Sequence, residues 1–132
     1  MKNERLSKLQ KWILINCYRV TILRDRSNLK LKSIKHNTHV NHDYDFYKED
    51  IYMDFYNLEI DPNKMCNESV AHFVSNEKSG VAWVSVHRVL KLLKDKGLID
   101  YFKPLGDAYS THITLTDEGI NVAESLIAND KK

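Results

Sequence analysis

Residues 81–119 of the chain read VAWVSVHRVLKLLKDKGLIDYFKPLGDAYSTHITLTDEG, and they divide into a helix-like part and a strand-like part. At 100° per residue, the apolar side chains of the first part share one side of a helix: Ala82, Val86, Val89, Leu90 and Leu93. The opposite side carries Val84, Arg88, Lys91 and Asp95. The spacing predicts an amphipathic helix that buries its apolar stripe and exposes a basic face.

A glycine marks the end of this helix. Gly97 follows the last apolar residue of the stripe, and glycine adopts the left-handed backbone of a helix end without steric cost. Lys94 and Lys96 fall in the last turn, where positive charge is favoured by the negative end of the helix dipole. We therefore expect the helix to end at about Lys96.

Two short segments after Gly97 predict a β-hairpin. Residues 98–102 and 109–115 are rich in β-branched and aromatic side chains, and the PLGD turn at 104–107 separates them. The sequence thus predicts a helix followed directly by a two-stranded ribbon.

This combination carries a resemblance to a known class of protein. The run from Ser85 to Ile99, the ribbon, and the segment from Leu115 to Gly119 together resemble the recognition helix, wing and post-wing segment of MarR/PadR-type winged-helix transcription regulators. The resemblance covers about a third of the chain. It implies an α+β, mainly helical fold, which is a winged helix-turn-helix with a two-stranded wing and flanking N- and C-terminal helices.

The resemblance also implies sequence-specific binding of double-stranded DNA as a transcriptional regulator, without a cofactor. The helix would enter the major groove and the wing would lie on the flanking backbone. The residues expected to contact DNA are Trp83, Ser85, His87, Arg88 and Lys91 on the helix and Lys103, Tyr109, Ser110 and His112 on the wing.

The length of 132 residues and an ordinary apolar fraction fit one folded domain spanning residues 1–132. Its winged-helix core would cover about 47–119, preceded by a polar connector at 24–46. No apolar run is long enough to span a bilayer, and the N-terminus lacks the apolar segment of a signal peptide. We expect a cytoplasmic protein that does not associate with membranes.

The chain opens with a predicted long helix. Asn3 is one candidate cap, and a capping box between Ser7 and Gln10 is the other. One side of this helix carries Leu6, Leu9, Ile13, Cys17 and Val20, and further apolar residues lie beside it at Trp12, Leu14 and Ile15. This excess suggests either central packing or a surface shared with a second copy. We favour a homodimer, because a C2 dimer matches palindromic half-sites.

The polar connector contains a possible edge strand and three histidines. Residues 29–34 alternate like an edge strand protected by lysines, although they also suit a helix or a loop. His36, His39 and His42 follow at intervals of three. That interval spreads side chains too widely around a helix or a strand for one metal ion, so we expect no metal site and interpret the segment as a connector.

Two further helices are predicted before residue 81. Residues 47–57 suit a short helix with Ile51, Phe55 and Leu58 toward the core, and the tyrosines around it suggest packing rather than a ligand site. Asp61 and Pro62 start a helix over residues 62–75, ahead of a turn at 75–80. Either 47–57 or 62–75 would then precede the recognition helix, and the short turn favours the latter.

The remaining features are structural. Thr116 or Asp117 would cap a final helix over 118–127. Cys17 and Cys66 each fall on an apolar stripe, which predicts buried thiols in a reducing compartment rather than a redox switch.

Charge is distributed unevenly along the chain. Lys and Arg outnumber Asp and Glu by ten to two in residues 1–35 and by five to two in residues 83–103. Acidic residues prevail by nine to three in residues 36–82 and by five to two in residues 104–132. The pattern predicts either a basic surface that attracts phosphates or mutual neutralisation on folding.

Catalysis finds no support in the sequence, which lacks a glycine-rich phosphate loop, Gly-x-Ser-x-Gly, His-Glu-x-x-His and Cys-x-x-Cys. We therefore expect no enzyme. Two alternatives to a regulator remain open. One is a winged-helix protein–protein interaction module, and the other is a DNA-binding component of plasmid or viral replication or partition.

Overall fold

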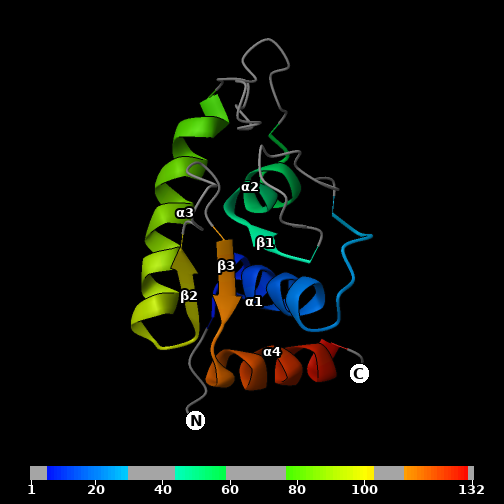
Figure 1. Ribbon diagram of the computed structural model, residues 1–132. Coiled ribbons are helices and arrows are strands. Elements are labelled where there is room, and N and C mark those ends of the chain that lie inside the picture. The colour runs from blue at the N-terminus through cyan, green and yellow to red at the C-terminus, as the bar shows by residue number, and fades with distance from the viewer. Residues whose placement is uncertain (1–5, 30–43, 59–76, 103–111, 131–132) are drawn as a thin grey trace.

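The computed structural model describes residues 6–29, 44–58, 77–102 and 112–130 (Figure 1). In chain order the described elements are α1 (Lys8–Thr21), β1 (Phe46–Tyr47), α2 (Lys48–Asp50), the π-helical turn η1 (Ile51–Phe55), α3 (Glu77–Asp95), β2 (Ile99–Phe102), β3 (His112–Leu115) and α4 (Asp117–Asp130). The prediction of a mainly helical α+β protein is therefore confirmed. None of the described helices combines the length and apolar character needed to cross a lipid bilayer.

Helix α1 lies at the centre of the described part of the chain, with α4 packed along one side and β3 on another (Figure 1). Its capping box is the predicted one: the Ser7 hydroxyl accepts the Gln10 N–H at 3.1 Å, and the Gln10 side-chain oxygen accepts the Ser7 N–H at 2.8 Å. Trp12, on the second apolar side, packs its ring against Phe46 and Phe55. The apolar excess of this helix therefore needs no second copy of the chain to cover it.

The sheet has three strands in the order β1-β3-β2, all antiparallel. The predicted pairing of the two ribbon segments is confirmed, with Ile99 opposite Leu115 and Tyr101 opposite Ile113. The prediction of a two-stranded wing is wrong, because β1 pairs with the other edge of β3 and makes it the central strand. Two residues are too short for strand periodicity, so β1 leaves no signal in the sequence.

Helix α3 begins at Glu77, so the turn predicted over residues 75–80 is wrong from Glu77 onward. Glutamate, lysine and serine tolerate helical backbone, and one glycine, Gly80, costs only about 1 kcal/mol inside a helix. The C-terminal end matches the prediction closely. Gly97 has φ +76°, its N–H donates to the Lys94 carbonyl at 2.9 Å, and the Leu98 N–H donates to the Leu93 carbonyl at 3.0 Å. These two bonds form a Schellman motif.

Thr116 joins the end of α3 to the start of α4. Its hydroxyl donates to the Gly97 carbonyl at 2.6 Å and accepts the Gly119 N–H at 3.0 Å, so Thr116 is the cap of the final helix. Its own N–H donates to the Leu98 carbonyl at 3.1 Å. This helix runs longer than the predicted 118–127, from Asp117 to Asp130.

Gly119 is expected to be the less replaceable of two glycines at this junction. A Cβ there would lie far closer to the Leu98 carbonyl oxygen than van der Waals contact allows, and this oxygen is backbone and cannot swing away. Gly119→Ala should lower the free energy of unfolding by about 1–3 kcal/mol, measured by urea denaturation. Gly97→Ala is the control, because a Cβ at that site meets open space and the positive φ is the only strain that alanine would add. Gly97→Asn should recover part of its loss, since asparagine tolerates this backbone, whereas Gly119→Asn should not. Equal losses at the two sites would contradict the steric explanation.

Candidate nucleic-acid interface

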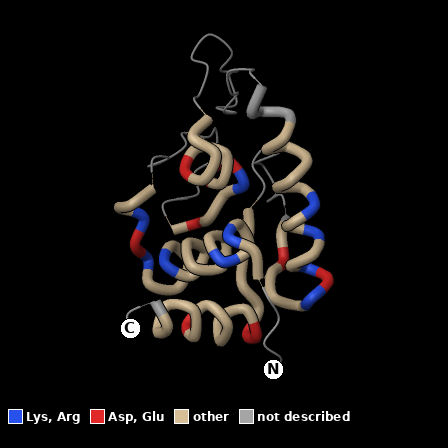
Figure 2. Tube along the Cα trace, turned by 180° about the vertical axis from the view of Figure 1, so that it is seen from behind, with Lys and Arg blue, Asp and Glu red and all other residues tan. Residues whose placement is uncertain are grey.

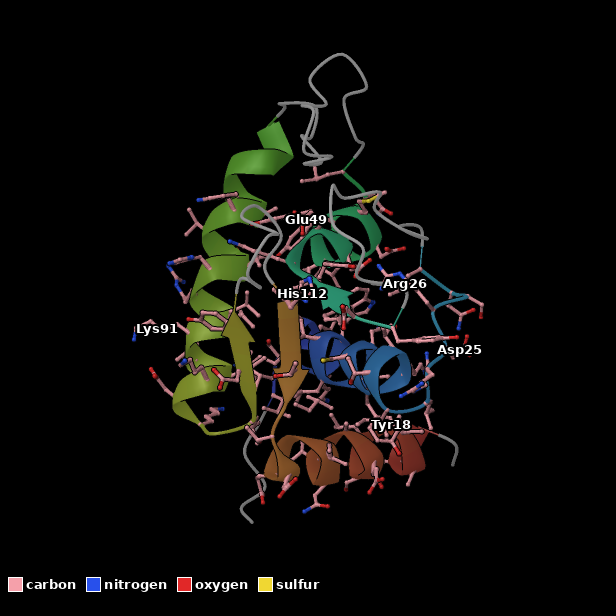
Figure 3. The ribbon with its side chains drawn as sticks, in the orientation of Figure 1. Tyr18, Asp25, Arg26, Glu49, Lys91 and His112 are labelled. Carbon is pink, nitrogen blue, oxygen red and sulfur yellow. The ribbon has the colours of Figure 1, made fainter. Side chains whose placement is uncertain are left out.

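The basic face predicted for the helix after residue 81 is exposed. Arg88 is exposed, and the Lys91 side chain is 70% accessible and points away from the molecule (Figure 3). The predicted apolar stripe faces inward, with Ala82, Val86, Leu90 and Leu93 buried and Val89 half-buried. Both predictions for the two sides of α3 are confirmed. We call Val84, Arg88 and Lys91 the outer face of α3.

Acidic side chains engage the basic residues mainly toward the C-terminal end of α3. The Lys91 ammonium lies 3.6 Å from the Asp95 carboxylate, and Lys94 donates to Asp100 at 3.0 Å. The hydrogen bond with Asp100 raises the pKa of Lys94, and the same bond lowers the pKa of Asp100. Both pairs are exposed, where ion pairs hold side chains only weakly, so Lys91 can turn toward another anion. Because Asp95 and Asp100 lie at the C-terminal end of α3, a phosphate would be repelled less at the N-terminal half of the outer face than at that end.

Trp83 projects from α3 onto the preceding helical segment. Its ring stacks on the buried Tyr52 ring with a centroid separation of 5.9 Å and an interplanar angle of 5°. The Lys48 ammonium lies 4.6 Å from the centre of the Trp83 ring, within the range of a cation–π interaction. The indole is still 59% exposed. Sequence reasoning missed Lys48 and Tyr52, because they lie more than 30 positions before Trp83 and no pattern links them.

The other predicted contact residues of α3 differ in accessibility. His87 is exposed beside the outer face, whereas Ser85 is half-buried. Three predicted wing contacts, Lys103, Tyr109 and Ser110, lie outside the described residues.

The prediction that His112 contacts DNA is not compatible with its position. The residue is only 3% exposed, its ring meets the Tyr47 ring edge-on at 4.8 Å, and its Nδ1 lies 3.6 Å from the Asp45 carboxylate. The cause is the unpredicted strand β1. By pairing Tyr47 opposite His112, it covers an edge of β3 that a two-stranded ribbon would leave open.

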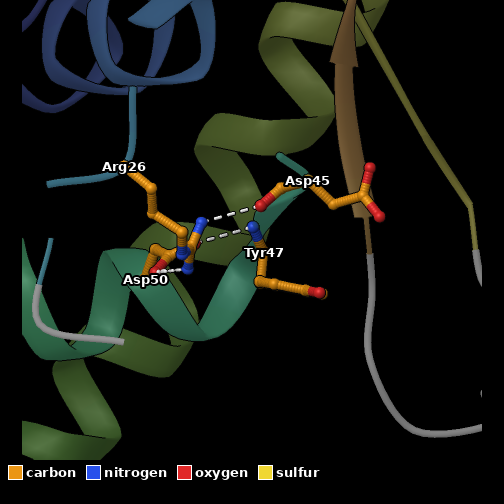
Figure 4. Close-up of polar contacts among 4 residues, drawn as sticks. All are labelled: Arg26, Asp45, Tyr47 and Asp50. Atoms are coloured by element: carbon orange, nitrogen blue, oxygen red, sulfur yellow. Dashed lines mark hydrogen bonds and ion pairs between the residues drawn. The ribbon is translucent and has the colours of Figure 1, made fainter. Parts of the chain in front are cut away.

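A buried ion pair holds β1 and α2 in place (Figure 4). The Arg26 guanidinium donates to the Asp50 carboxylate at 2.5 Å and to the Asp45 carbonyl at 2.7 Å. The second Asp50 oxygen accepts the Tyr47 N–H at 2.8 Å. Arg26 is 7% exposed and Asp50 is fully buried. We call these four residues the Arg26 anchor.

Two opposing effects act on the pKa of Asp50 in the Arg26 anchor. Burial raises the pKa of Asp50 to about 6, although Arg26 and the Tyr47 N–H both act to lower it. The anchor joins a residue from the basic N-terminal segment to one from the acidic segment that follows. Part of the uneven charge distribution along the chain is thus neutralised inside the fold.

Uneven charge is also seen on the surfaces of two described helices. Along α4 the only charged residues are acidic, whereas α3 carries several basic positions (Figure 2). Helix α4 begins with two exposed carboxylates, Asp117 and Glu118. Because the neighbouring Thr116 is bonded to Gly97, these carboxylates lie close to the C-terminal end of α3. Arg88 lies about two turns before that end of α3 and so is separated along the helix from these carboxylates.

Other candidate chemistry from the sequence gains no support. Within the four described ranges, no three His, Cys, Asp or Glu side chains gather where they would hold a metal ion, and His36, His39 and His42 lie outside those ranges. Cys17 is buried and donates to the Ile113 carbonyl at 3.3 Å, and burial raises the pKa of its thiol. Cys66 and the helix predicted over 62–75 lie outside the described residues.

Comparison of the chain with protein-family models, with curated proteins and with solved structures finds no significant match.

Proposed function

We propose that the chain is a winged-helix protein that binds double-stranded DNA sequence-specifically and acts as a transcriptional regulator. In this proposal α3 is the recognition helix, and the wing beside it is the three-stranded sheet, whose β2–β3 hairpin follows α3 directly. The observation that carries the proposal is the exposed outer face of α3, with Arg88 and Lys91 directed away from a well-packed apolar side.

The arrangement of the described elements supports this assignment. A long helix ends in a Schellman motif and is followed at once by an antiparallel hairpin, with further helices before and after it. A helix is about 10–12 Å across with its side chains, and the major groove is about 12 Å wide. Arg88 suits bidentate contact with guanine, and Lys91 suits a phosphate as a point charge.

The salt dependence of DNA binding tests the proposal. A mixed-sequence fluorescent duplex titrated with the wild-type chain should bind at about 50 mM salt and weaken as salt rises, because each neutralised phosphate contributes a slope of about −0.9 to log K against log salt. Three phosphate contacts would lower the affinity roughly 40-fold between about 50 and 200 mM salt. Absence of binding at the lower salt would refute the proposal. Selection from random duplexes then identifies the preferred site.

A second candidate is a protein-interaction module, and one observation favours it. Val81, Trp83 and Val84 on α3 are all more than half exposed, which is unusual for large apolar side chains in one helix. Failure to bind duplex at low salt would favour this candidate. The homodimer stays a prediction, and sedimentation of the chain with and without the selected duplex measures it.

A further inference from the structure

The exposed apolar side chains of α3 lie among positive charges. Val81, Trp83 and Val84 are 64%, 59% and 56% exposed. Lys48 lies over the Trp83 ring, and Arg88 follows Val84 by one helical turn. A surface in which apolar groups alternate with cations complements the major groove, where bases carry methyl groups and the borders are phosphates. The same charges make this patch a poor site for an apolar protein segment.

Val84 is the apolar residue best aligned with the basic side chains. It lies four residues before Arg88 and seven before Lys91, so the three side chains follow one line along the outer face. Trp83 is turned about 100° away from Val84 around the helix, and the stack on Tyr52 holds it there. A base contacted by Arg88 would therefore have Val84, rather than Trp83, as the next side chain along the groove.

The spacing along the helix corresponds to a spacing along DNA. A recognition helix follows the groove rather than the DNA axis, so side chains three to four residues apart reach neighbouring base pairs. Among the four bases only thymine presents a methyl group in the major groove, and apolar side chains recognise it by contact. Guanine presents two acceptors that match an arginine fork.

On the basis of the proposed function, we propose that Val84 contacts the 5-methyl group of a thymine and is a specificity-determining residue. The preferred site then contains a thymine one or two base pairs from the guanine that Arg88 contacts. Val84 should lose little side-chain entropy on binding, because a β-branched side chain in a helix already holds one χ1 rotamer.

Uracil substitution tests this inference, because deoxyuridine lacks only the methyl group. Each thymine of the selected duplex is replaced in turn by deoxyuridine, and the affinity of the wild-type chain is measured. At one position of each half-site we expect a loss of about three- to tenfold, the value of burying one methyl group. Val84→Ala should bind the thymine and uracil duplexes equally. Leu92→Ala is the matched control, because Leu92 is also exposed, at 42%, but lies two turns further along and about 80° around the helix.

The outcomes separate this inference from the function on which it rests. Equal binding of thymine and uracil duplexes by the wild type would overturn the role of Val84 while leaving DNA binding intact. Discrimination that survives in Val84→Ala would overturn it too, since another residue would then read the methyl. If the wild type binds no duplex at all, the proposed function fails and the inference with it. Circular dichroism of both variants verifies that the helix is retained.

Discussion

Arg26→Met is expected to lower the free energy of unfolding by about 3–5 kcal/mol near pH 8, because it leaves the carboxylate of Asp50 buried without its partner. Methionine keeps much of the side-chain length but removes the bonds to Asp50 and to the Asp45 carbonyl. It also removes the contact of the guanidinium with the Tyr47 ring, whose centroid lies 5.2 Å from Cζ. Thermal and urea denaturation measure the loss.

The pH dependence of this loss has a definite sign. The pKa of Asp50 is already raised by burial to about 6, above the ordinary value near 4, and without Arg26 it should rise further. A carboxyl with a raised pKa in the folded state stabilises the protein below its unfolded pKa, and that stability is lost as the pH rises through the folded value. The difference between wild type and Arg26→Met should therefore be largest near pH 8 and should shrink as the pH falls to about 6, below which Asp50 is protonated in both folded proteins.

Two control variants isolate the buried pair. Arg26→Met combined with Asp50→Leu should recover part of the loss, because no uncompensated charge remains inside. Asp100→Asn breaks the exposed pair with Lys94 and should change the free energy of unfolding far less than Arg26→Met does. A loss of similar size for the exposed and the buried pair would contradict the importance given to burial.

Arg88→Ala combined with Lys91→Ala is expected to weaken binding of the selected duplex about 10- to 1000-fold at moderate salt. The salt slope should become shallower by about 1 for each phosphate contact that is lost. Fluorescence anisotropy over a series of salt concentrations measures both quantities. Singly, Arg88→Ala should relax the preference at one base pair, whereas Lys91→Ala should weaken all sequences alike.

Arg19→Gln combined with Arg24→Gln provides a charge-matched control. These residues lie at the C-terminal end of α1 and just after it, on the side of the molecule away from α3 (Figure 1). Removing the same two charges there should change affinity and slope far less. If the two double variants weaken binding equally, the interaction is a diffuse attraction to net charge, and α3 has no special role.

Features carried by local sequence were largely predictable. The buried stripe from Ala82 to Leu93 has the period of a helix. Gly97 is a residue type that accepts the left-handed backbone at a helix end, and Ser7 and Gln10 have the spacing of a capping box. Each of these signals lies within a few positions along the chain. The outer face of α3 was predictable too, because the side of an amphipathic helix opposite its buried stripe is exposed.

Features that depend on long-range pairing were not predictable from one sequence. Strand β1 consists of two residues whose partners on β3 come 65 or more positions later, and its pairing alone turned His112 from an expected contact into a buried residue. The bond between Arg26 and Asp50 and the stack of Tyr52 on Trp83 likewise join separate segments. Their members look like ordinary polar or aromatic residues until the chain folds.

The Thr116 junction has a consequence for how α3 would meet a ligand. Because one hydroxyl binds both Gly97, which follows the last turn of α3, and the first turn of α4, the two helices cannot rotate independently without breaking hydrogen bonds. Tyr18 adds a bond from α1 to Glu124 of α4 at 2.8 Å. The orientation of α3 is thus settled during folding, so little conformational entropy should be lost when it docks. If α3 reads DNA as proposed, such a rigid helix would leave bending and twisting to the duplex, which favours sequences that deform easily.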